Sequence, residues 1–132
     1  MRKIFSILVI LFTHVLIASE NEQIINVQID HCIDYDEKLN RPSIKRDSQG
    51  FKLSYVAVVY NGEKLVDPRL VRVANSLLLL WKTKQTQENA SACACFEKID
   101  LSFKSDIKEN GTIVIKQNNK IVHQVIVPKL KD

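Results

Sequence analysis

Glycine and proline are scarce in this chain of 132 residues, which contains three of each. A collagen-like, repeat-fibrous or intrinsically disordered chain would need far more of one or both. Charge of one sign is also scarce, because 19 Lys and Arg oppose 15 Asp and Glu and neither kind forms a long block. Along the sequence this charge is too weak and too dispersed to argue for nucleic acid, where a clustered basic face is expected, or for a polybasic segment at an anionic membrane.

Recognisable catalytic motifs are absent as well. The sequence contains no G-x-S-x-G, no H-E-x-x-H and no phosphate-binding loop. Each of these patterns places a nucleophile, a metal or a phosphate in a defined geometry, and nothing else in the chain replaces them. The sequence therefore predicts a protein that is not an enzyme and that carries no cofactor.

The first nineteen residues have the pattern of an export signal. Arg2 and Lys3 precede an apolar run from Ile4 to Ile17, and Ala18-Ser19 follows. A basic start, a short apolar middle and small residues before a polar stretch are typical of a cleaved leader. The run is shorter than the roughly 18 to 20 apolar residues that span a bilayer. We expect a signal peptide at 1–19, a secreted or periplasmic single domain at 20–132, and no stable membrane span after cleavage.

Three cysteines follow the leader, at Cys32, Cys93 and Cys95. Thiols outside the cytoplasm tend to pair, so a disulfide from Cys32 to either Cys93 or Cys95 is the favoured prediction. A metal site is the alternative, because thiolates and imidazoles bind zinc or copper(I). Its candidate ligands are His31, Cys32, Cys93, Cys95 and His123, whose spacing matches no established zinc framework.

The first half of the domain alternates apolar and polar residues. Residues 24–35 predict a half-buried strand, and residues 51–60 predict a second one. The segment between them carries mixed charge and Pro42, and it predicts a mobile loop at about 36–50. Asn61-Gly62 is a strong hairpin signal and predicts a return strand over residues 63–66.

Residues 67–84 predict an amphipathic helix. Asp67 would cap its N-terminus and Pro68 would occupy its first position. At 100° per residue one stripe is apolar. The stripe consists of Leu70, Val73, Ala74, Leu77, Leu78 and Trp81. Leu79 would face outward from this helix, which makes it a candidate for contact with a partner.

The C-terminal part predicts strands over residues 96–103, 112–116 and 120–127. In the last of these, Ile121, Val125 and Val127 share one face while Val122 and Ile126 share the other. A strand that is apolar on both faces needs cover on both sides, so the first three residues are further candidates for partner contact. The predicted fold class is α+β, an antiparallel sheet of five to six strands with one amphipathic helix packed across it.

The layout from Asn61-Gly62 onward resembles the curli-assembly accessory protein family over about residues 61–128. Leu65-Val66-Asp67 leads into the helix that closes on Trp81, and Leu101-Ser-Phe103 follows. The last part of the likeness is the hairpin from 111–115 to 121–128. Asn75-Ser76-Leu77 stands where the family has an aromatic helix start. The resemblance implies a periplasmic adaptor or chaperone that delivers fibre subunits to an outer-membrane pore.

These observations together predict an exported, non-catalytic protein-binding or assembly factor. Its partner would be another exported protein, contacted through a sheet edge or through the strand at 120–127. Two alternatives stay open. One is an inhibitor of an extracytoplasmic hydrolase that inserts the loop at 36–50 into a cleft, and the other is a small secreted protein that binds a metal or reacts through its thiols.

Overall fold

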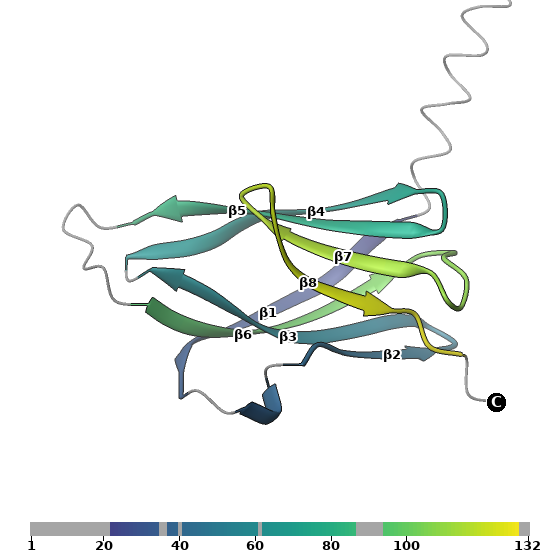
Figure 1. Ribbon diagram of the computed structural model, residues 1–132, viewed down its shortest axis with the longest axis horizontal. Coiled ribbons are helices and arrows are strands. Elements are labelled where there is room, and N and C mark those ends of the chain that lie inside the picture. The colour runs from purple at the N-terminus through teal and green to yellow at the C-terminus, as the bar shows by residue number, and fades with distance from the viewer. Residues whose placement is uncertain (1–21, 35–36, 40, 61, 87–93, 130–132) are drawn as a thin grey trace, which may run out of the picture.

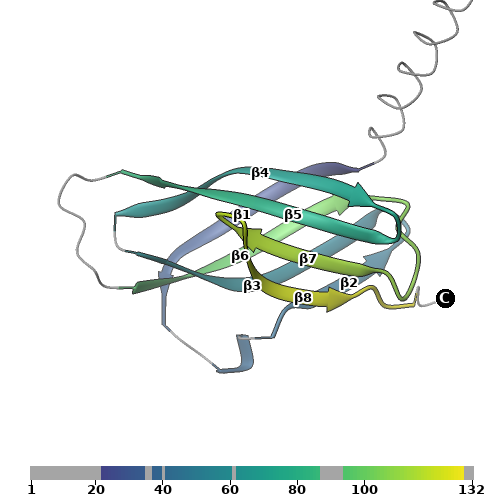
Figure 2. The same cartoon turned by 45° about the horizontal axis from the view of Figure 1, so that its top comes forward.

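The computed structural model describes residues 22–34, 37–39, 41–60, 62–86 and 94–129. Eight strands and one short 3-10 helix occupy these residues. They are β1 (Gln23–Ile33), η1 (Glu37–Leu39), β2 (Ser43–Asp47), β3 (Gly50–Tyr60), β4 (Glu63–Val73), β5 (Ser76–Gln85), β6 (Ala94–Lys104), β7 (Thr112–Gln117) and β8 (Lys120–Ile126). Sheet 1 has the strand order β1-β6-β3-β2 and sheet 2 has the order β4-β5-β7-β8. The two sheets form the two layers of a β-sandwich (Figures 1 and 2).

The predicted α+β class is wrong, because residues 67–84 form strands rather than an amphipathic helix. They make up the end of β4 and most of β5, joined by a turn at Ala74 and Asn75 where Ala74 has a φ of 53°. Pro68 lies at a bulge between Val66 and Arg69, where its missing N–H breaks no ladder hydrogen bond. The leucine run at 77–80 is compatible with the helical period of 3.6 and with the strand period of 2. Its pairing with β7 makes it a strand.

Two other local predictions also change. The predicted loop at 36–50 contains η1 and β2, and β2 pairs antiparallel with β3. The turn at Gly62 does not close a hairpin, since β3 belongs to sheet 1 and β4 to sheet 2. Gly62 has a φ of 88°, so it forms the predicted turn, but the strands on either side of it do not pair with each other. The predicted hairpin of the last two strands is confirmed as β7 and β8, with Asn118 and Asn119 in its turn.

The core lies between the two sheets. Alternate residues of the central strands point inward and are buried, as the period of 2 requires. In sheet 2, the parallel pairing of β5 with β7 sets Leu77 beside Ile113 and Leu79 beside Ile115. In sheet 1, Phe51 stacks on Phe103 with the ring centroids 5.1 Å apart. All of these side chains belong to the main hydrophobic cluster.

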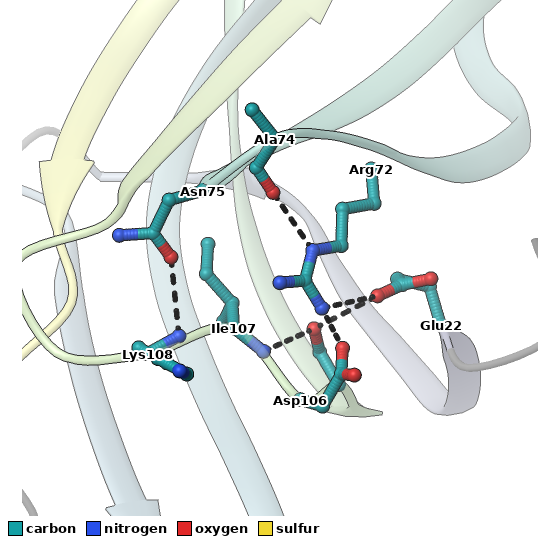
Figure 3. Close-up of polar contacts among 8 residues, drawn as sticks. Glu22, Arg72, Ala74, Asn75, Asp106, Ile107 and Lys108 are labelled. Carbon is teal, nitrogen blue, oxygen red and sulfur yellow. Dashed lines mark hydrogen bonds and ion pairs between the residues drawn. The ribbon is translucent and has the colours of Figure 1, made fainter. Parts of the chain in front are cut away.

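Polar contacts join the ends of the sheets around Arg72 (Figure 3). The Arg72 guanidinium pairs with Glu22, 3.5 Å away, and with Asp106, and its Nε donates to the carbonyl of Ala74 at 2.9 Å. Asn75 Oδ1 accepts a hydrogen bond of 3.2 Å from the backbone N–H of Lys108. These contacts connect the β4–β5 turn of sheet 2 to the start of β1 and to the segment after β6, so they position one end of the sandwich.

Candidate functional site

A disulfide joins Cys32 of β1 to Cys95 of β6 across 63 residues of sequence, with the two Cα atoms 5.0 Å apart. This settles which of the two predicted partners Cys32 takes, and Cys93 lies outside the described residues. Cys32 has a φ of 50° within the irregular pairing between Asp30 and Ile33, a bulge that lets its side chain turn toward β6. Disulfides of this kind are typical of proteins in oxidising compartments.

Those predicted metal ligands that lie among the described residues do not gather around a common point. Two of the three thiols form the disulfide, and His123 belongs to β8 of the other sheet. Within the described ranges, no group of three or more His, Cys, Asp or Glu side chains is placed to hold a metal ion. Thiolate ligation would require the Cys32–Cys95 bond to be reduced first.

His31 contacts a buried carboxylate beside this disulfide. Its Nδ1 lies 3.1 Å from Glu97 Oε1, and the Glu97 side chain is 3% exposed. Glu97 points into the core from β6, between Cys95 and Ile99, and its Oε2 finds no hydrogen-bond partner among the described residues. The His31 side chain itself is 61% exposed. A single acid on the inward side of an otherwise apolar strand was the signal that could have identified Glu97.

The residues predicted to contact a partner occupy different environments. Leu79 is completely buried between the sheets, because it alternates inward along β5 instead of facing out from a helix. Val127 is buried too, and Val125 packs partly buried against the core. Ile121 alone of the four is exposed, at 56%. The strand at 120–127 therefore covers the core with one face and presents the other to solvent.

A hollow with a volume of about 530 Å³ opens between β3 and β8. Its lining includes Val58, Tyr60, Val122 and His123. The part of β3 beyond Ser54 has no partner in β2, yet two of its carbonyls are occupied. Gln117 Nε2 donates to Val58 O and His123 Nε2 donates to Val56 O, each at 2.9 Å. These side-chain donors tie sheet 2 to the free part of β3 and thereby limit strand addition there.

Tyr55 lies under this hollow, with its ring in edge contact with His123 at 5.6 Å between centroids. Burial raises the pKa of the Tyr55 hydroxyl above its usual value near 10, and the adjacent Trp81 lowers it by a smaller amount. Tyr55 Oη and Trp81 Nε1 both lack a well-formed hydrogen bond to any described residue.

Tyr55 should make the fold sensitive to alkali. Since its pKa is higher in the folded than in the unfolded chain, its contribution to stability is complete below pH 10 and is lost as the pH rises further. Tyr55→Phe keeps the ring, so it should reduce the loss of unfolding free energy between pH 9 and about pH 11. Urea unfolding at both pH values measures this, with Tyr60→Phe as the exposed control. Equal alkaline losses in wild type and Tyr55→Phe would contradict the assignment.

The outer face of sheet 2 carries a continuous set of aliphatic side chains. In register, Val71, Leu78 and Val114 lie side by side across β4, β5 and β7. The next positions along these strands and β8 extend the set. We name it the aliphatic patch, and it consists of Val71, Val73, Leu78, Leu80, Val114 and Ile126. Val73 is 55% exposed and Ile126 68%, and neither is covered by another described element. Contiguous apolar surface of this kind marks contact sites.

Basic side chains occupy the other half of the same face. We name them the basic patch, and they are Lys64, Arg69, Lys82, Lys84 and Lys116. Arg69 and Lys116 flank Leu80 in one cross-strand row, while Lys82 is opposite Val66 in the next. No member forms an ion pair with another residue in the described part of the chain. A hollow of about 440 Å³ lies among Arg69, Lys82 and Lys116, with Asp67 as the acid at its margin.

The outer face of sheet 1 is different. Two neighbouring cross-strand rows are polar, whereas the end of the face farther along β3 carries the apolar row Ile33, Phe96 and Val58. One row contains Lys45, Lys52, Ser102 and Asn26, and the next contains Ser43, Ser54, Asp100 and Gln28. Ser54 Oγ even donates to Asp100 at 2.6 Å. This polar part of sheet 1 is the ordinary solvated face of a sandwich. Sheet 2 carries the candidate site, because its aliphatic side chains lie beside a group of basic ones that are unpaired among the described residues.

Comparison with known proteins identifies no relative. No family model, no curated protein and no solved structure matches this chain. Among the described residues, no helix is long and apolar enough to cross a membrane. The residues that the structure describes define the class by themselves, an eight-stranded, disulfide-linked β-sandwich.

Proposed function

We propose that this chain is an exported, non-catalytic protein-binding or assembly factor that contacts another exported protein through the outer face of sheet 2. The observation that carries the proposal is the aliphatic patch, because uncovered Val71, Val73 and Ile126 would be expected at an interface and not on a solvated face. The central row of valine and leucine side chains would form its apolar centre.

Export is supported by two independent features. Residues 1–19 have the pattern of a cleaved leader, and the domain carries a disulfide that an oxidising compartment would preserve. The partner would therefore be met outside the cytoplasm.

The proposal is tested by placing a photo-reactive residue at position 71 or at position 28. Val71 is in the aliphatic patch, whereas Gln28 is on the polar face of sheet 1. We expect the probe at 71, and not the one at 28, to crosslink one defined protein of the exported fraction. Val71→Glu should then weaken binding of that purified protein about tenfold or more, since burying an unpaired charge costs at least about 1.4 kcal/mol.

Asn26→Glu, on the same face of β1 as Gln28, is the matched control, because it adds the same charge on the opposite sheet and faces the neutral Ser102. It should leave affinity unchanged, and both variants should unfold at the wild-type denaturant concentration. Equal crosslinking from both positions, or equal binding by both variants, would refute the proposal.

A further inference from the structure

We infer that the outer face of sheet 2 recognises an acidic amphipathic segment, one that carries aliphatic side chains beside carboxylates. This inference rests on the proposed protein-binding function and specifies the chemistry of the partner. Its basis is the division of one face into an aliphatic patch and a basic patch.

The division follows directly from strand register. Along β5, Leu78 and Leu80 point outward and are followed on the same side by Lys82 and Lys84. The antiparallel β4 runs the other way, so on the same side Arg69 comes before Val71 and Val73 along the chain. Outward residues two apart along a strand are separated by about 6.7 Å, and neighbouring strands by about 4.8 Å. The centres of the two patches therefore lie roughly 7 to 13 Å apart on the same face of the sheet.

The charges of the face are of one sign. Among the outward-pointing strand positions of sheet 2 there is no Asp or Glu, and the acid on this side is Asp67 in the β4 bulge. Because the five basic side chains have no ion-pair partner among the described residues, an incoming carboxylate would displace no existing pair. Arg69 and Lys116 stand on either side of Leu80, so a carboxylate near Leu80 would be within reach of both.

The same spacing occurs in short peptide segments. On an α-helix, residues four and seven apart are separated by about 6 and 10.5 Å along the axis. On a strand, residues two and four apart are separated by about 7 and 13 Å. A segment whose aliphatic side chains are followed at those intervals by Asp or Glu would place both groups on their matching patches. Apolar contact would then supply affinity, and charge would supply orientation.

A second copy of this chain fits the face poorly. A two-fold axis in the plane of the interface would superpose the basic patch either on itself or on the aliphatic patch. The first arrangement brings like charges together, and the second buries unpaired charges against Val71 and Leu78.

A bilayer also fits less well than a protein segment. Interfacial binding buries an apolar face about 5 to 10 Å into the bilayer, with the basic groups held at the headgroups. Here short valines and long lysines leave the same surface, so the lysines extend further. A sulfated polysaccharide would use the basic patch and leave the aliphatic patch uncovered.

The test uses the exported protein and two synthetic peptides of the same aliphatic residues, one with glutamates and its twin with lysines at the spaced positions. Fluorescence anisotropy should detect the glutamate peptide with at least tenfold higher affinity, and this preference should weaken as salt is raised. The double variant Arg69→Glu/Lys116→Glu should lose the preference. Lys45→Glu/Lys52→Glu changes charge equally on adjacent strands of sheet 1 and should keep it.

Each contrary result has a distinct meaning. Equal affinity for both peptides, or no binding of either, overturns the acidic-segment inference. The proposed protein-binding function still holds after that result if Val71→Glu weakens binding of the protein that is crosslinked from position 71. Tighter binding to phosphatidylserine vesicles or to heparin than to the glutamate peptide, with the same loss in Arg69→Glu/Lys116→Glu, also overturns the inference. Failure at position 71 itself contradicts the proposed function instead.

Discussion

Replacing Cys95 by serine is expected to lower the free energy of unfolding by about 4 kcal/mol. The disulfide to Cys32 closes a loop across 63 residues, which restricts the unfolded chain far more than a short loop would. It also fastens β1, an edge strand whose pairing with β6 is interrupted twice. Without the bond, β1 should be the first strand to open.

Denaturant unfolding of the oxidised protein measures this effect. Cys32→Ser should match Cys95→Ser, because either change removes the same bond. Cys93→Ser is the control, since it removes a thiol and leaves the Cys32–Cys95 bridge intact. A large loss of stability in Cys93→Ser with little change in Cys95→Ser would show that the bridge uses the other cysteine. Reduction of wild type should reproduce the loss seen in Cys95→Ser.

The second large effect is expected at Trp81. Trp81→Ala should lower the free energy of unfolding by about 3 to 5 kcal/mol, the range typical of deleting a large aromatic side chain from a core. Trp81 is 4% exposed and points inward from β5 in the same hydrophobic cluster as Tyr55 and Leu65. Because the neighbouring strands are fixed by their ladders, the cavity would close only in part.

Lys82→Ala is the matched control for this change. Lys82 is the next residue along β5 and points outward, so its loss should alter stability by no more than about 0.5 kcal/mol. Urea unfolding followed by far-UV circular dichroism measures both variants. Similar losses for the two substitutions would contradict the inward and outward alternation on which both patches depend.

Most strands could be predicted from alternation alone. The segments at 24–35, 51–60 and 96–103 alternate with a period of 2, and they form most of β1, β3 and β6. The segment at 67–84 could not be assigned in this way, since four consecutive leucines satisfy a period of 3.6 as well as one of 2. Asp67-Pro68 added a helix-start signal that in fact belongs to a bulge.

The position of the candidate site also depends on whether residues 67–84 form a helix or strands. In a helix over residues 67–84, Leu79 would face outward and Leu78 would lie in the buried stripe. With the segment paired as β4 and β5, the two leucines exchange places, because successive strand residues point to opposite faces. The candidate site at Arg69, Leu78 and Lys116 therefore could not be predicted from the sequence, because it is formed by the pairing of β4, β5 and β7.

The sequence by itself determined the alternation of most strands, the turn at Gly62, the hairpin of β7 and β8, and the need of Cys32 for a downstream partner. These depend on local backbone preference and on thiol chemistry. Only the tertiary structure decided which strands share a sheet, that Cys95 is the partner, and which leucines face solvent. The physical reason is that a strand's hydrogen bonds are completed by residues far along the chain, so pairing and exposure are set by the whole sandwich and not by any one segment.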